Sequence, residues 1–116
     1  MPRHGLRLVF HKLTLKEILM NNQKQVYSVS YDLNSPGQSY KRLYDRLTDL
    51  GGFRLMDSYW LVASKLNADG IKADLMNAMD SNDALFITSC NLLDMNAHNV
   101  DIQALLSWGI LAILPD

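Results

Sequence analysis

The sequence predicts an α+β domain in which four strands and two helices alternate along the chain. Residues 26–33 combine β-branched and aromatic side chains and stop at the turn-forming residues 34–37. Residues 38–50 carry apolar side chains at helical spacing, and residues 84–90 form a short apolar stretch that is typical of a strand. With 116 residues, 48% of them hydrophobic and 20% charged, the chain has the size and composition of one globular domain.

The first predicted helix, residues 38–50, follows a strand that ends near Asp32. Its apolar residues recur at i, i+3, i+4, i+7 and i+10, namely Tyr40, Leu43, Tyr44, Leu47 and Leu50. We expect Ser39 to cap the start of this helix, and Gly51 and Gly52 to end it.

Residues 53–64 predict two short strands, because two polar residues at 57–58 interrupt the apolar pattern as a tight turn would. Asn67 is expected to cap a second helix that runs to about residue 79, and residues 80–83 read as a turn. The resulting order is strand, helix, strand, strand, helix, strand. This is the ferredoxin-like order, an antiparallel sheet with two helices on one face.

The residues after this pattern predict further structure at the C-terminus. Residues 96–108 are expected to form a third helix, and residues 110–114 an apolar tail. Such a tail has to be covered, either by its own domain or by a second chain. The polar run at residues 94–101 contains side chains that can bind metal ions, but its spacing fits helix capping better than a calcium loop.

Cys90 is the only cysteine in the chain, so no internal disulfide can form, which fits a reducing, cytoplasmic setting. It lies in an apolar strand pattern and is expected to be a buried structural residue. No apolar run approaches the roughly 20 residues needed to span a bilayer. We therefore expect no membrane association.

Charge divides the chain into a basic N-terminal extension, residues 1–25, and an acidic domain, residues 26–116. The extension carries five Lys or Arg and one Glu, a net charge of +4, and the remainder a net charge of −5. Residues 1–19 are either an upstream extension or disordered tail, or a basic amphipathic arm that packs locally or touches nucleic acid or a partner. The acidic domain weighs against tight, sequence-independent nucleic-acid binding by the domain alone.

Asp32 is the best candidate for a functional residue. A carboxylate at the end of a strand can hold a divalent metal, or it can simply cap the turn at residues 34–37. One carboxylate is too few for a tight magnesium or manganese site. Two chains that meet about a two-fold axis would each supply the same carboxylate.

Three segments carry a resemblance to a known family: SYDLN-PGQ-Y at residues 30–40, DSYWLV at residues 57–62, and ND-LFIT at residues 82–88. Their order and spacing, across residues 26–90, resemble the SinR/Cas-two-like family. These proteins are relatives of the second CRISPR-associated protein, an endoribonuclease-like fold. The virulence-associated VapD ribonucleases are a weaker match.

The resemblance implies a homodimeric, metal-dependent endonuclease that cuts RNA or DNA. It assigns Asp32 as the ligand of Mg²⁺ or Mn²⁺ at the dimer interface, and it places Arg54 and Ser58 at the second strand as further catalytic candidates. Arg54 would hold a phosphate through its planar guanidinium group. The alternative is a non-catalytic dimeric scaffold or adaptor that binds a protein or nucleic-acid partner, with the apolar C-terminal tail as a protein-binding surface.

Overall fold

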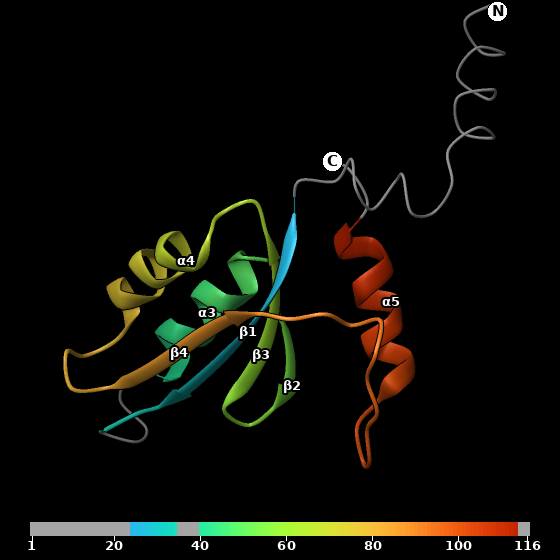
Figure 1. Cartoon of the computed structure of the whole chain (residues 1–116). Helices are drawn as coiled ribbons and strands as arrows, with labels where there is room; N and C mark the ends of the chain where they lie inside the picture. Colours follow the sequence, from blue (N-terminus) through green and yellow to red (C-terminus); the bar gives the residue numbers. More distant parts are fainter. Residues whose placement is uncertain (1–23, 35–39, 114–116) are drawn as a thin grey trace, which may run out of the picture.

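The computed structural model describes residues 24–34 and 40–113, which form a four-stranded antiparallel sheet and its helices (Figure 1). The elements in chain order are β1 (Gln25–Asp32), α3 (Tyr40–Asp49), β2 (Phe53–Met56), β3 (Tyr59–Ser64), α4 (Ala68–Leu75), a 3₁₀ turn (Met76–Ala78), β4 (Ala84–Ser89) and α5 (Ile102–Ile113). The strand order across the sheet is β2-β3-β1-β4. The predicted ferredoxin-like α+β fold with an additional C-terminal helix is confirmed.

Helices α3 and α4 cover one face of the sheet, and the hydrophobic core lies between them and the strands (Figure 1). Strand side chains alternate between the two faces, so Val29 and Tyr31 of β1 point toward the helices together with Trp60 and Val62 of β3. Among the core side chains, the largest with almost no solvent exposure are Leu43, Leu47, Ile71, Leu75, Val29 and Val62. The helical spacing of apolar residues in α3 therefore predicted its buried face correctly.

Two glycines form the turn between α3 and β2, as predicted. Gly51 has φ +74°, a left-handed conformation that ends the helix. The N–H of Gly52 bonds to the carbonyl oxygen of Leu47 at 2.9 Å. A Cβ atom at Gly52 would lie 2.7 Å from that oxygen, so only glycine fits here. Ser39, the predicted cap, lies outside the described residues.

Helix α4 begins as predicted but ends early. The Asn67 side chain accepts the N–H of Gly70 at 2.9 Å, which confirms the predicted cap. The α-helix stops at Leu75, so the prediction of helix to about residue 79 is wrong in its last turn. The backbone tightens there into a 3₁₀ turn, in which the N–H of Met79 bonds to the carbonyl of Met76 at 3.4 Å.

The C-terminal helix begins later and runs further than predicted. Residues 96–101 are not helical, and Asn99 adopts φ 56°, which a helix cannot continue through. Asp101 caps α5 by accepting the N–H of Ala104 at 3.0 Å. The expected apolar tail is therefore part of α5 over its described length, and the capping interpretation of this run is confirmed at Asp101.

Helix α5 stands beside β2, away from α3 and α4 (Figure 1). The Trp108 ring lies 5.9 Å from the Phe53 ring between centroids, and its Nε1–H donates to the carbonyl of Gly51 at 2.8 Å. These contacts attach the C-terminal helix to the edge of the sheet. Within residues 24–34 and 40–113, no helix has the length and apolar character needed to cross a membrane.

Candidate functional site at the end of β1

Asp32 is the last residue of β1 and is exposed. It pairs with Ala84 of β4, and its side chain points away from α3 and α4 because Tyr31 beside it points into the core. The Asp32 carboxylate makes no hydrogen bond or ion pair with any other residue that the structure describes. With respect to the described residues, this carboxylate on the face opposite α3 and α4 is available to a ligand from outside the protomer.

Asp83, rather than Asp32, caps the backbone where β1 ends. Its Oδ1 accepts the N–H of Asn34 at 2.7 Å, and its Oδ2 accepts the N–H of Asp80 at 2.7 Å. The alternative prediction, that Asp32 caps the turn at residues 34–37, is therefore not supported at Asn34. The rest of this turn, within residues 35–39, lies outside the described residues. One carboxylate therefore joins the end of β1 to the turn before β4.

Ser58, the second candidate residue, lies in the turn between β2 and β3 and is exposed. Its carbonyl oxygen accepts the N–H of Tyr31 at 3.2 Å. Since Tyr31 directly precedes Asp32, the structure brings the Ser58 backbone to the same end of β1. The fold thus places two of the three candidates close together along the sheet.

Arg54, the third candidate, lies on the other face. It pairs with Trp60, whose side chain is in the core, so Arg54 leaves β2 on the side of α3. Its guanidinium carbon lies 4.6 Å from the centroid of the Tyr44 ring, and it donates to the Tyr44 hydroxyl at 3.0 Å. Within one protomer, Arg54 and Asp32 are therefore directed to opposite faces of the sheet.

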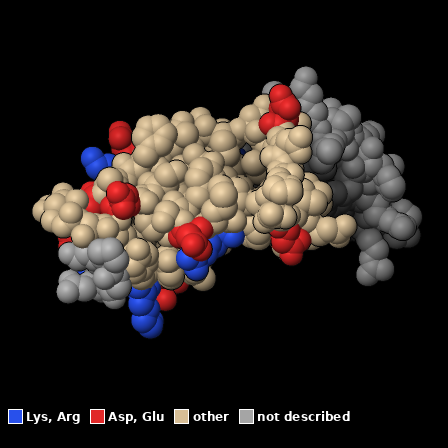
Figure 2. All heavy atoms as spheres, turned by 90° about the horizontal axis from the view of Figure 1, so that it is seen from below, with Lys and Arg blue, Asp and Glu red and all other residues tan. Residues whose placement is uncertain are grey.

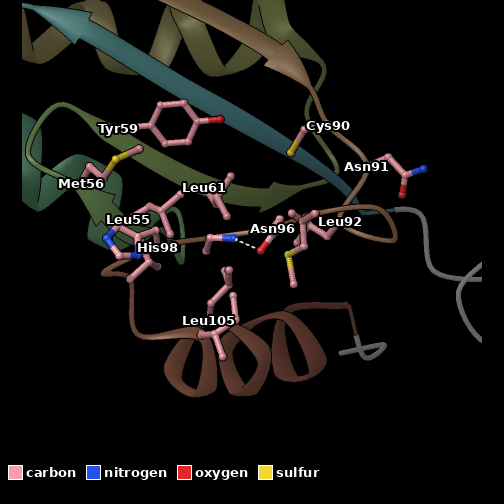
Figure 3. A pocket seen from close by; sticks show the side chains of 14 residues that line it. Leu55, Met56, Tyr59, Leu61, Cys90, Asn91, Leu92, Asn96, His98 and Leu105 are labelled. Atoms are coloured by element: carbon pink, nitrogen blue, oxygen red, sulfur yellow. Dashed lines mark hydrogen bonds between the residues drawn. The ribbon is translucent and has the colours of Figure 1, made fainter.

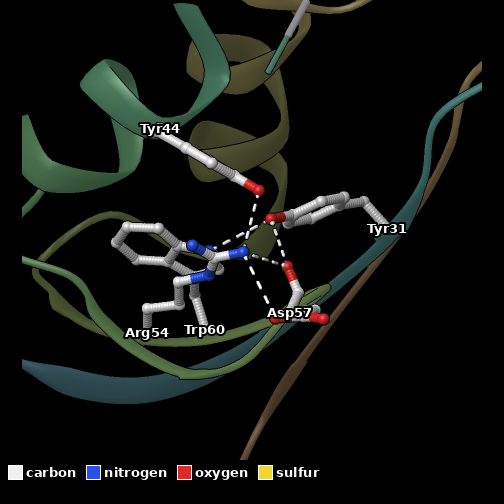
Figure 4. A network of polar contacts seen from close by, with 5 residues as sticks. All are labelled: Tyr31, Tyr44, Arg54, Asp57 and Trp60. Carbon is white, nitrogen blue, oxygen red and sulfur yellow. Dashed lines mark hydrogen bonds and ion pairs between the residues drawn. The ribbon is translucent and has the colours of Figure 1, made fainter. Parts of the chain in front are cut away.

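Arg54 belongs to a polar network that holds the β2–β3 turn (Figure 4). Its guanidinium group bonds to the carbonyl of Asp57 at 3.3 Å and lies 3.5 Å from the Asp57 carboxylate. The Tyr31 hydroxyl donates to the same carbonyl at 3.1 Å and accepts the Nε1–H of Trp60 at 3.1 Å. Burial, with a smaller contribution from the Tyr44 hydroxyl, raises the pKa of Tyr31 to about 12.

Sequence reasoning missed this network. The sequence pattern places Tyr44 in a helical apolar stripe and places Tyr31 and Trp60 within the predicted strand regions 26–33 and 53–64. The signal that was available is their chemistry: buried Tyr and Trp side chains need hydrogen-bond partners for their polar atoms. An Arg on the neighbouring strand is such a partner, so Arg54 acts here as part of the support for the turn.

A single protomer does not provide a complete metal site. Among the residues that the structure describes, no group of three or more His, Cys, Asp or Glu side chains is close enough to hold an ion. Mg²⁺ needs several oxygen ligands. The donor set at Asp32 fits a metal only when a second copy brings another carboxylate to it.

The charged side chains are mixed in sign. On the face shown in Figure 2, Lys and Arg side chains lie near Asp side chains and form no continuous basic patch over the described part of the chain. On α3, Lys41 pairs with Asp45 at 2.8 Å and Arg46 pairs with Asp74 of α4 at 2.5 Å. Much of this positive charge is compensated locally.

Fold and site together define a small ferredoxin-like α+β domain with an exposed carboxylate at the end of its first strand. A solved structure with this fold is that of a hypothetical protein, TT1823, from Thermus thermophilus, which superposes with a TM-score of 0.55. The identity is 20%, and the match covers 66% of this chain and 94% of the Thermus chain. This likeness shows the fold alone. No family model and no curated protein matches the chain.

Proposed function

We propose that the chain is a Cas-two-like, metal-dependent endonuclease that hydrolyses phosphodiester bonds of RNA or DNA as a homodimer. The observation that carries this proposal is the exposed carboxylate of Asp32 at the end of β1, which bonds to no other residue that the structure describes. If Asp32 had a structural role, its carboxylate would accept a hydrogen bond from the turn that follows β1. The N–H of Asn34 in this turn instead donates to Asp83. The resemblance across residues 26–90 supports the same residue.

Two copies of Asp32 would hold Mg²⁺ or Mn²⁺ between the protomers. Two facing carboxylates repel each other unless a cation or a proton lies between them, so the pair would favour a bound ion. When bound, the ion supplies Lewis-acid stabilisation of the charge that builds on the phosphate. Ser58 lies at the same end of β1 and can donate a hydrogen bond to a phosphate oxygen.

Arg54 has a supporting role in this proposal. Its guanidinium group is bonded to Tyr44 and to the Asp57 carbonyl, and it leaves the sheet on the face opposite to Asp32. It therefore fixes the turn that carries Ser58. The phosphate-binding role that the family resemblance suggested for Arg54 requires a substrate or a partner chain that reaches both faces.

Metal binding and hydrolysis test the proposal separately. Manganese titrated into the purified chain and followed by electron paramagnetic resonance should bind with a stoichiometry of one ion per two chains. Cleavage of labelled single-stranded RNA and of duplex DNA should require the metal. In Asp32→Asn, cleavage should fall at least about 100-fold, the scale of losing a group that stabilises transition-state charge.

The matched control is Asp49→Asn, which removes the same charge from an exposed carboxylate at the end of α3. It should retain both manganese binding and cleavage. Cleavage that persists unchanged in Asp32→Asn would identify a contaminating nuclease and end the proposal. Manganese binding that persists unchanged in Asp32→Asn would remove the metal assignment as well.

Helix α5 favours a second candidate function, a non-catalytic dimeric scaffold or adaptor. The helix carries no charged residue over its 12 positions, yet Leu106, Ile110 and Leu111 are 49%, 60% and 71% exposed. Large apolar side chains gathered on an exposed surface often mark a site of protein–protein contact. The exposed flank is therefore a suitable surface for a protein partner or a second copy.

Light scattering on the parent chain and on Ile110→Asp tests this second candidate. A charge in the centre of an apolar interface should convert a dimer to a monomer or weaken its dissociation constant at least about 100-fold. If the parent is a monomer throughout the micromolar range, the scaffold interpretation loses its basis. If Ile110→Asp dimerises as the parent does, α5 is not the interface.

A further inference from the structure

A cleft of about 380 Å³ lies between the C-terminal segment and the face of the sheet opposite α3 and α4 (Figure 3). Asp32 is not among its lining residues. Its floor is formed by Tyr59 and Leu61 of β3 with Leu55 of β2, and Leu105 of α5 closes the opposite side. The volume falls within the range of about 300–1,000 Å³ that is usual for ligand pockets. The cleft is therefore too large to be a packing defect of the core.

The cleft is apolar, and its rim is adaptable. Met56 and Met95 both line it and are 53% and 38% exposed. Methionine side chains are flexible and are frequent on surfaces that bind apolar helices or peptides. The lining is therefore suited to an apolar segment of chain.

The outer wall of the cleft is acidic. Asp94 and Asp101 lie within the segment that forms this wall. Both are exposed, and residues 90–113 contain no Lys or Arg. An occupant with positive charges around an apolar stripe would match both the lining and the rim.

The chain enters the described structure at the edge of this cleft. Cys90, which lines the cleft, donates its N–H to the carbonyl of Val26 at 3.0 Å, so the first residues of β1 lie beside the opening. Residues 1–23 precede this point and lie outside the described residues. Their sequence carries four Lys or Arg against one Glu, with Leu6, Val9, Phe10 and Leu13 at helical spacing.

We propose that residues 1–19 of this chain bind in the cleft, with their apolar stripe against the lining and their cations near Asp94 and Asp101. Ten residues separate Leu13 from Lys24, which allows a reach of up to about 35 Å. Charge complementarity and the point of chain entry select this occupant. The proposal does not depend on nuclease activity or on the metal.

Cys90 provides a direct probe, because it is the only thiol in the chain and lies in the cleft. The reaction of the full chain with 5,5′-dithiobis(2-nitrobenzoate) is followed at fixed pH. In Phe10→Asp, which places a charge in the apolar stripe, the rate should rise at least about fivefold as protection is lost.

Asn21→Asp is the matched control, since it adds the same charge outside the apolar stripe and should leave the Cys90 rate unchanged. Circular dichroism of all variants checks that the fold is retained. Equal rates in the parent and in Phe10→Asp would overturn the proposal. A parent rate that falls with increasing protein concentration would also overturn it, because the segment would then come from a second copy.

Discussion

The Asp83 carboxylate accepts the backbone N–H of Asn34 at 2.7 Å across 49 positions of sequence. The same carboxylate accepts the N–H of Asp80 with its other oxygen, also at 2.7 Å. Asp83 thus stabilises the end of β1 and the start of β4 at once. This arrangement leaves Asp32, two residues before Asn34, without a structural task among the described residues.

Asp83→Ala should therefore destabilise the fold, while Asp32→Ala should not. The first change removes the acceptor of two backbone N–H groups, and each of these hydrogen bonds contributes about 0.5–1.5 kcal/mol to the free energy of unfolding. The second removes an exposed carboxylate and should stay within about 0.5 kcal/mol of the parent. Urea unfolding followed by circular dichroism measures both. A larger loss in Asp32→Ala than in Asp83→Ala would reverse the assignment of the two carboxylates.

Tyr31→Phe should show how much the buried network contributes to stability. The Trp60 Nε1–H donates to the Tyr31 hydroxyl at 3.1 Å, and both residues are only 6% exposed. Without the hydroxyl, this buried donor loses its acceptor at a cost of about 1–3 kcal/mol in the free energy of unfolding. Tyr27→Phe is the control, because no described residue bonds to the half-buried Tyr27 hydroxyl.

The same hydroxyl predicts a pH dependence at the alkaline end. Burial raises the pKa of Tyr31 from 10.0 to about 12, so the folded state favours the neutral phenol. Its contribution is complete below pH 10 and is lost as the pH rises toward 12, because the unfolded chain ionises first. The stability difference between the parent and Tyr31→Phe should therefore shrink between pH 10 and 12. A difference that grows over this range would contradict the assignment.

The sequence was sufficient to predict the sheet and its two covering helices because each has a local signal. Residues 40–50 repeat apolar side chains at helical spacing, and Leu43 and Leu47 are indeed fully buried. The polar pair at residues 57–58 marked the β2–β3 turn in the position where the structure has it. Patterns of this kind are visible in the sequence because the same type of contact recurs along the whole helix or strand.

The C-terminal segment and the candidate site were harder to predict from the sequence, because they depend on single contacts between individual residues. The cap from Asp101 to Ala104 decides where α5 begins, and the apolar spacing before it suggested an earlier start. Cys90 was expected to be buried but is half-buried in the cleft, whose far wall comes from α5. The opposite directions of Asp32 and Arg54 follow from strand register, which sequence spacing did not reveal.

Two glycines should respond to alanine in opposite directions. At Gly52, a Cβ atom would lie 2.7 Å from the Leu47 carbonyl oxygen and 3.0 Å from the Trp60 ring, and backbone cannot yield there cheaply. Gly52→Ala should therefore destabilise the fold by about 1–3 kcal/mol, the cost of overpacking. At Gly109, inside α5, a Cβ atom meets nothing within 4 Å.

Gly109→Ala should therefore stabilise α5, by about 0.5–1 kcal/mol, because alanine loses less backbone freedom than glycine in a helix. Thermal unfolding of both variants and of the parent chain measures the expected destabilisation and the expected stabilisation in one experiment. Since α5 is attached to β2 through Trp108 and Phe53, the gain appears in the global transition only if the helix unfolds together with the sheet. A stabilised Gly109→Ala in a single cooperative transition would show that α5 is an integral part of the domain. An unchanged midpoint with a second, shifted transition would show that the helix unfolds separately.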